Sequence, residues 1–283
     1  MKISTEIESI ANHVGFPRAV ELCGKAGFDA WDFSLFPLCP SDGEGGEALR
    51  ARAREHLKLA RELKSIGEAV GIHCNQSHAP FPVRIPAIRE SLPYALECTA
   101  EAGGKICVIH PNNNKTAEEN AEMYAELLPV AHALGVKIAA ENMWNWNKEK
   151  NESSFAACAT GEDFVHHIDA LGDPFLVACL DLGHAEMRGS GDGSVNMIHA
   201  LGHRLKALHI HDNDCHRDQH QIPFSRSIDY PPIVKALREI GYDGYFTLEA
   251  DMYLSAYSPG TVFDGVVKLA ESARRLADLF DQK

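Results

Sequence analysis

The sequence lacks the features that mark membrane, secreted and dinucleotide-binding proteins. No apolar run approaches the roughly 20 residues that a helix needs to cross a bilayer. The first residues, MKISTEIESI, do not follow the basic and then apolar pattern of a signal peptide. No G-x-G-x-x-G motif opens the first helix, which leaves a dinucleotide-binding fold without support. We therefore expect a soluble, cytoplasmic protein with no membrane partner.

Paired cysteines and clustered basic residues are also missing. The eight cysteines form no C-x-x-C pair and several lie in apolar segments, so we interpret them as reduced and mostly buried. The 283 residues include 27 Lys and Arg against 40 Asp and Glu, a formal charge of −13. Because nucleic acid binding depends on clustered Lys and Arg, we expect no nucleic acid partner. No P-loop or Arg cluster near the last two strands indicates a phosphate site, and we interpret Arg188 and Arg226 as surface residues.

Short apolar segments alternate with longer amphipathic segments along the whole chain. Eight of the short segments have the composition of strands, namely Lys2–Ile7, Ala30–Ser34, Gly71–Ser77, Lys105–His110, Lys137–Asn142, Phe175–Asp181, Leu205–His211 and Tyr245–Ala250. The periodicity between them predicts helices over Glu47–Val70, Pro86–Ala102, Ala117–Leu134, Glu162–Leu171, Pro232–Ile240 and Gly265–Phe280. With no linker or change of composition, this pattern favours an α/β fold in which residues 1–283 form a single (β/α)₈ TIM barrel.

Acidic and imidazole side chains follow six consecutive predicted strands. Since the carboxyl ends of parallel barrel strands meet at one mouth, these groups should lie close together. From the third strand to the eighth they are His78, His110, Glu141, Asp181 with His184, His209 and His211 with Asp218 and His220, and Glu249. Each alone has an ordinary explanation, such as a buried ion pair for Glu141 or a helix N-cap for Asp181. Their coincidence at six strand ends predicts a metal site.

The mixture of side chains restricts the kind of metal. Carboxylates combined with imidazoles suit Mn²⁺, Zn²⁺, Co²⁺ or Mg²⁺, and no cysteine stands at the clustered positions. We therefore expect a catalytic divalent ion. Six further histidines fall in helix-like segments and are not expected to be ligands; His166 and His167 we interpret as surface residues, and the others are His56, His132, His199 and His203.

The combined motifs resemble the xylose-isomerase-like barrel superfamily, which includes ketose 3-epimerases, inosose-processing enzymes and endonuclease IV. The matching motifs are Glu141-Asn142, Asp181-x-x-His184, His209-x-x-Asp212 followed by Asp218-x-His220, and Glu249. By this resemblance, the ion of the epimerases would be held by Glu141, Asp181, His209 and Glu249. We choose His209 because an acid follows it three residues later, but His211 lies on the same face of the strand and stays open as the alternative.

The resemblance implies a metal-dependent sugar isomerase or epimerase, acting on a ketose or related polyol through an enediolate. Mn²⁺ or Zn²⁺ is the cofactor that we expect first. Glu141 and Glu249 would transfer the proton. The residues that would contact the sugar are His184, His211, Trp144, His78 and His110, and Trp146 would help Trp144 to stack on the sugar ring.

Other activities remain open at this point. A lyase or dehydratase of a keto-sugar or inosose would use the same intermediate. A zinc phosphodiesterase similar to endonuclease IV would use several ions, with additional ligands His78, His110, His184, Asp218 and His220. A sugar-binding barrel without activity is a non-enzymatic alternative. The sequence leaves open the substrate, the number of metal ions and whether the chain forms a homo-oligomer.

Overall fold

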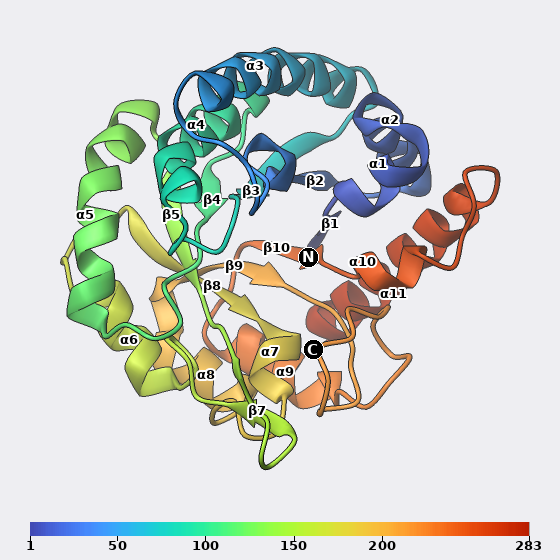
Figure 1. Ribbon diagram of the computed structural model, residues 1–283. Coiled ribbons are helices and arrows are strands. Elements are labelled where there is room, and N and C mark those ends of the chain that lie inside the picture. Colours follow the sequence, from blue (N-terminus) through green and yellow to red (C-terminus); the bar gives the residue numbers. More distant parts are fainter. Residues whose placement is uncertain (283) are drawn as a thin grey trace.

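The computed structural model describes residues 1–282, and its centre is a ring of parallel strands (Figure 1). Six strands pair in the order β2 (Ala30–Ser34), β3 (His73–His78), β4 (Ile106–Val108), β5 (Lys137–Glu141), β8 (Leu176–Asp181) and β9 (Leu205–His209). β1 (Lys2–Thr5) pairs with β10 (Tyr245–Leu248). Parallel bridges from Glu6 to Asp32 and from Ile210 to Leu248 join the two groups. The ring is therefore closed, as the sequence predicts.

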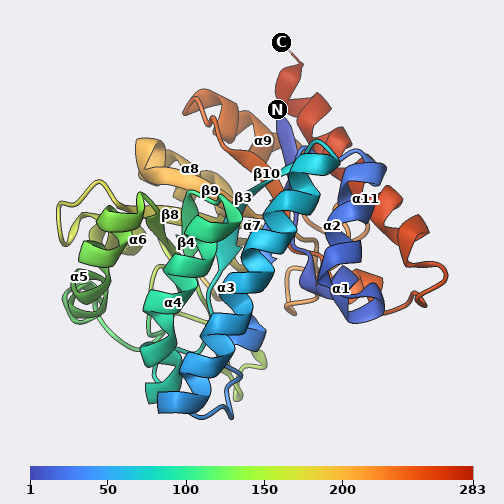
Figure 2. The same ribbon diagram turned by 90° about the horizontal axis from the view of Figure 1, so that it is seen from above.

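Helices surround the strands on the outside (Figure 1). They are α1 (Glu8–Val14), α2 (Phe16–Ala26), α3 (Gly46–Ala69), α4 (Pro86–Ala102), α5 (Ala117–Leu134), α6 (Gly161–Asp169), α8 (Ser194–Leu201), α9 (Tyr230–Glu239) and α11 (Val262–Asp281). The short helices α7 (Leu182–Glu186) and α10 (Asp251–Leu254) follow β8 and β10 at the carboxyl ends of the strands. Figure 2 shows the long helices α3 and α4 side by side. An antiparallel hairpin of β6 (Asn145–Asn147) and β7 (Glu152–Ser154) projects after β5. Among residues 1–282, no helix is long and apolar enough to cross a membrane.

Local signals in the sequence set where the helices begin and end. The hydroxyl of Thr116 accepts the backbone N–H of Glu119, and the Glu119 side chain accepts the N–H of Thr116, which forms a capping box at the start of α5. The same helix ends at Gly135, whose φ of 65° is readily adopted only by a residue without a Cβ atom. α4 begins with Pro86 in its first turn, a position where the missing N–H has no cost.

The two-residue period of the strands places the polar cluster. Val108, Ala139, Val177, Cys179 and Ala207 form a small apolar cluster inside the ring, separate from the large core beneath the helices. Because alternate side chains of a strand point the same way, Glu141 lies above Ala139, Asp181 above Cys179 and His209 above Ala207. The acids and imidazoles thus form the next layer of the barrel interior, at the carboxyl ends of the strands.

Candidate functional site

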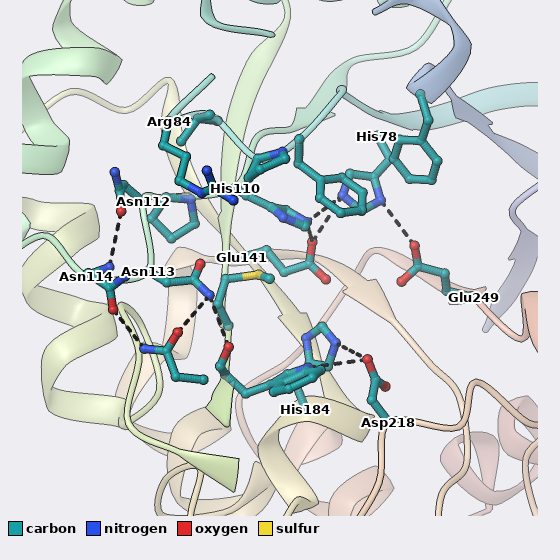
Figure 3. Close-up of a pocket in the computed structure, with 18 of the residues that line it drawn as sticks. His78, Arg84, His110, Asn112, Asn113, Asn114, Glu141, His184, Asp218 and Glu249 are labelled. Carbon is teal, nitrogen blue, oxygen red and sulfur yellow. Dashed lines mark hydrogen bonds and ion pairs between the residues drawn. The ribbon is translucent and has the colours of Figure 1, made fainter. Parts of the chain in front are cut away.

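A pocket of about 550 Å³ opens at the carboxyl ends of the strands (Figure 3). It is lined by most of the residues that the sequence predicts for the site, which are His78, His110, Glu141, Trp144, His184, Asp218, His220 and Glu249. Asp181, His209 and His211 are 0% exposed and lie beneath its floor. The structure therefore brings the predicted residues together. It does not support direct contact between His211 and a substrate, because His211 has no exposed surface.

Two carboxylates converge on Nδ1 of His209. Its Nδ1 atom lies 2.8 Å from Oε1 of Glu141 and 3.3 Å from Oε2 of Glu249. One donor atom each of Glu141, Asp181, His209 and Glu249 lies within 4.8 Å of the others. These four side chains come from β5, β8, β9 and the end of β10. This is the set of residues that the sequence assigns to the ion.

Asp32, which the sequence reasoning missed, holds the opposite side of the His209 ring. Its Oδ2 atom lies 3.3 Å from Nε2 of His209 and accepts a hydrogen bond from Nε2 of Gln76 at 3.0 Å. A carboxylate on one ring nitrogen fixes the orientation of an imidazole, so that the other nitrogen can donate to an acid or, once it is deprotonated, offer its lone pair to a metal ion. Nδ1 of His209 therefore faces Glu141 and Glu249. The signal in the sequence was an Asp in the middle of the apolar segment Ala30–Ser34.

His78 and His110 join the two glutamates across the floor of the pocket (Figure 3). Nδ1 of His78 lies 3.1 Å from Oε1 of Glu249, and its Nε2 lies 2.7 Å from Nε2 of His110. Nε2 of His110 lies 3.0 Å from Oε2 of Glu141. Burial lowers the pKa of His110, although Glu141 opposes the change. A neutral ring there can offer a lone pair or a single N–H.

A second cluster consists of His184, His211, Asp218 and His220. Nδ1 of His184 donates to the carbonyl oxygen of Asn142 at 3.0 Å, and Nδ1 of His220 donates to that of Glu249 at 2.8 Å. Their Nε2 atoms lie 3.3 and 3.1 Å from the two oxygens of Asp218. The carbonyl bonds therefore aim both Nε2 atoms at one carboxylate, an arrangement typical of imidazoles that bind a metal.

His211 completes this second cluster and requires a glycine beside it. Its ring stacks on His220 with centroids 3.9 Å apart, and its Nε2 lies 3.2 Å from Oδ1 of Asp181. A Cβ atom on Gly183 would lie 1.9 Å from the His211 ring, so only glycine leaves room for it. The N-cap explanation of Asp181 is also correct in part. Its Oδ1 accepts the N–H of His184 at 2.7 Å and caps α7, which leaves Oδ2 available.

The buried polar atoms without hydrogen bonds gather at this site. Seven such side-chain atoms occur in residues 1–282, and five of them belong to Glu141, Asp181, His211 and Asp218. Leaving a buried polar atom unpaired is costly, and such atoms in a native protein usually indicate an unseen partner. Oxygen and imidazole nitrogen are the donors that divalent cations prefer. The residues present therefore fit a divalent metal ion.

The histidines also control the charge of the acids. Burial alone would raise the pKa of Glu141, but His209 and His110 outweigh burial and hold that pKa well below its ordinary value. Burial would likewise raise the pKa of Asp218, and His184 and His220 lower it instead. Both carboxyl groups are thus ionised and can act as ligands or as acceptors of a proton.

The two tryptophans after β5 have different places. Trp144 borders the pocket as predicted, and its indole N–H donates to Oδ2 of Asp218 at 3.3 Å. Trp146 does not line the pocket; its ring packs against the guanidinium of Arg217, 4.0 Å from the ring centroid. Among the histidines set aside, His167 is buried, not at the surface, and its Nε2 lies 3.2 Å from Nδ2 of Asn120.

Comparison with known proteins places the chain in a family. Residues 18–279 match the model of the xylose isomerase-like TIM barrel family, and the protein belongs to it. A D-tagatose 3-epimerase-like protein has the same fold, with a TM-score of 0.72, 19% identity and coverage of 99% of this chain and 98% of the other. The IolI protein with a bound zinc atom gives a TM-score of 0.69 at 18% identity, covering 99% and 98%. Fructoselysine 3-epimerase of Escherichia coli O157:H7 is 26% identical over 136 residues, 48% of this chain and 46% of its own.

Glu6, just beyond β1, is a second acid that the sequence reasoning missed. Its side chain is 5% exposed and accepts hydrogen bonds from the N–H and the hydroxyl of Ser9. Burial outweighs these bonds and raises the pKa of Glu6 from 4.5 to about 8. Folding therefore favours the protonated form of this carboxyl group.

The raised pKa of Glu6 predicts that stability falls as the pH rises. The contribution of the neutral carboxyl is complete below its unfolded value of 4.5 and is lost as the pH passes through about 8. Between these limits we expect wild type to lose on the order of 5 kcal/mol of unfolding free energy relative to Glu6→Gln, which has no charge to bury. Urea denaturation of both proteins at pH 5 and pH 8.5 measures the difference. The exposed variant Glu62→Gln is the control, and parallel pH profiles for wild type and Glu6→Gln would contradict the assignment.

Proposed function

We propose that this protein is a metal-dependent epimerase or isomerase of a ketose or a related polyol. The observation that carries the proposal is the pair Glu141 and Glu249, which reach the same pocket from β5 and from the end of β10 and meet at the His209 ring. Inversion of configuration at the carbon next to a carbonyl needs one group that removes the proton of this carbon and another that returns a proton to it. The family membership and the similarity to fructoselysine 3-epimerase support the same class of reaction.

Glu141, Asp181, His209 and Glu249 are the residues that would hold the ion, with Asp32 behind His209. The zinc in the IolI structure and the mixture of oxygen and nitrogen donors support Zn²⁺ or Mn²⁺. A bound divalent cation would polarise the carbonyl and the neighbouring hydroxyl of the sugar and so make the proton between them more acidic.

The side chains of this protein would carry out the proton transfer. One glutamate accepts the proton from the carbon beside the carbonyl and leaves an enediolate, and the other, which has first taken up a proton from solvent, protonates the same carbon from the opposite face. The first glutamate then releases its proton to solvent, so that each turnover starts with one glutamate ionised and the other protonated. His78 touches Glu249, and the neighbouring ring of His110 touches Glu141, so the pair can steady both carboxylates and donate to substrate oxygens. Trp144 and Phe36 border the same pocket and would exclude water from one side of the sugar.

The proton-transfer role of Glu249 can be tested with an amide. Glu249→Gln keeps an oxygen donor for a metal but removes the basic carboxylate, so we expect exchange of solvent deuterium into the sugar to fall about 100-fold or more. NMR spectra in D₂O with D-fructose, D-tagatose and D-allulose, together with metal analysis of the variant, measure both properties. The surface variant Glu62→Gln should exchange at the wild-type rate.

Unchanged exchange in Glu249→Gln with metal still bound would exclude the role of Glu249. Mass spectrometry of the products separates the related alternative, since a lyase or dehydratase of a keto-sugar or inosose would release water and change the mass of the sugar. An epimerase would leave the mass unchanged apart from deuterium.

Asp32 should control metal affinity through His209. Asp32→Asn retains the size of the side chain but replaces the carboxylate that lies 3.3 Å from Nε2 of His209. We expect metal affinity to weaken about 10-fold to 100-fold, because partners of ligating histidines typically contribute this much. Competition with a chelator measures the affinity. Asp29→Asn, directly before the same strand, is the matched control, and wild-type affinity in Asp32→Asn would show that Asp32 has no such part.

The cluster of His184, His211, Asp218 and His220 favours a second candidate, a multinuclear zinc phosphodiesterase. Because both ring nitrogens of His211 and Oδ1 of Asp218 form no hydrogen bond in residues 1–282, we expect this cluster to bind its own ion. Elemental analysis after zinc loading should give at least two ions per chain and one fewer in Asp218→Asn. A wild-type content of one ion would contradict this expectation.

Activity assays then decide between the two candidates. Deuterium exchange into a ketose without cleavage of bis(p-nitrophenyl) phosphate supports the epimerase. Cleavage without exchange supports the phosphodiesterase. The net charge of −13 argues against a nucleic acid as the substrate of such a phosphodiesterase.

A further inference from the structure

The pocket has room beyond the cluster on its floor. Its volume of about 550 Å³ lies within the range of roughly 300 to 1,000 Å³ that is typical of sites for ligands larger than one small sugar. A ketose carbon at Glu141 and Glu249 would occupy only the inner end. The outer end is bordered by Arg84, in the loop after β3, and by Asn112, in the loop after β4.

Arg84 is the one Lys or Arg side chain among the described residues that line this pocket. It forms no ion pair and no side-chain hydrogen bond within residues 1–282, whereas Arg89 of α4 pairs with Glu126 at 2.8 Å. Figure 3 shows the Arg84 side chain extending over the pocket toward His110. An unpaired guanidinium at the edge of an acidic site, in a protein of charge −13, can be matched by an anionic ligand.

Asn112 supplies a second free donor beside it. Its Oδ1 accepts the N–H of Asn114 at 3.2 Å, and its own backbone N–H donates to Oδ1 of the buried Asn120 at 2.8 Å. These bonds hold the residue in place while its Nδ2 group donates to no acceptor within residues 1–282. Nδ2 of Asn113 donates to the carbonyl oxygen of Trp144 at 3.0 Å and ties the loop to the segment after β5. The amide is therefore positioned before a ligand arrives, which reduces the entropy lost on binding.

We propose that the outer end of the pocket binds an anionic group of the substrate, a carboxylate or a phosphate, through Arg84 and Asn112. The inference rests on the proposed function and adds the class of substrate, a ketose whose chain ends in an anion. The guanidinium fork forms two parallel N–H···O bonds with either kind of anion, and such charge-assisted bonds are stronger than those between neutral groups. The acidic floor repels the anion, so the substrate enters with its uncharged carbonyl end toward Glu141 and Glu249.

The experiment compares one neutral and two anionic ketoses on the metal-loaded protein. The probes are D-fructose, D-fructose 6-phosphate and 5-keto-D-gluconate, and the variants are Arg84→Gln, Arg84→Lys and the control Arg89→Gln. Calorimetry gives the dissociation constants and NMR gives deuterium exchange. We expect at least one anionic sugar to bind wild type tenfold or more tightly than fructose, with the preference lost in Arg84→Gln, partly kept in Arg84→Lys and unchanged in Arg89→Gln. The tighter of the two anions identifies phosphate or carboxylate.

Two results would overturn the inference, and both are separate from failure of the proposed function. They are equal binding of all three sugars by wild type, and an anion preference that survives in Arg84→Gln. An anion preference that depends on Arg84 supports the inference even if no sugar exchanges deuterium, in which case only the epimerase assignment fails. Conversely, exchange that occurs without any anion preference retains the assignment and rejects the Arg84 site.

Discussion

Three carboxylates buried within a few ångströms of one another are the constraint on which the site depends. Glu141 and Asp181 are 0% exposed and Glu249 is 9% exposed, so water cannot offset the repulsion among them. The structure offsets it with a shell of imidazoles, of which His209 contacts Glu141 and Glu249 and His211 contacts Asp181. Breaking one such pair would leave an uncompensated buried charge. The same shell leaves several donor atoms without partners, a deficit that the proposed divalent cation would remove.

The order of the barrel layers makes this arrangement compatible with a stable fold. Two residues before Glu141, on the same face of β5, lies Ala139, and two residues before His209 on β9 lies Ala207. Both alanines are buried and apolar. Polar side chains also lie deeper in the barrel, where Asp32, Gln76, Asn75 and Thr247, inside β2, β3 and β10, form a hydrogen-bonded network across the ring. A network that satisfies its members fixes side-chain positions and keeps the strand ends in register. The fold therefore places the buried acids and imidazoles on rigid strands, while loops supply much of the rest of the pocket lining.

Most of the barrel could be predicted because its signals are local. β2, α4 and α5 have the bounds that the periodicity gives, and the other predicted strands differ by a few residues at their ends. The periodicity does not predict α1 and α2, because Gly15, Phe16 and Pro17 interrupt the apolar pattern there. In the structure Gly15 turns the chain between the two helices at a φ of 81°, and Pro17 lies in the first turn of α2, where proline is tolerated. The hairpin β6 and β7 was also missed, since it is held by tertiary bonds such as Ser153 to the carbonyl of Arg188.

The site shows the same division between local and nonlocal information. Residues at strand ends could be assigned because a strand end is a local feature and the barrel brings all ends together. Asp32 and Glu6 could not, because both fall inside predicted strands, Ala30–Ser34 and Lys2–Ile7, and only the fold shows that their side chains are buried. The sequence has no cluster of Arg near the last two strands, whereas the free guanidinium of Arg84 lies after β3.

The distribution of charge in the pocket gives a direction to any substrate. Carboxylates occupy the floor and the exposed Arg84 occupies the rim, and Phe36, Trp144 and Met143 add uncharged surface to the same pocket. Fixed charges of opposite sign at the two ends of a pocket orient a ligand before it reaches the reacting groups. The proposed proton transfer needs this orientation, because a sugar has several similar carbons that carry hydroxyl groups. The reaction would occur at the one carbon that lies between Glu141 and Glu249. The rim would then select the carbon by fixing its distance from the anionic end of the chain.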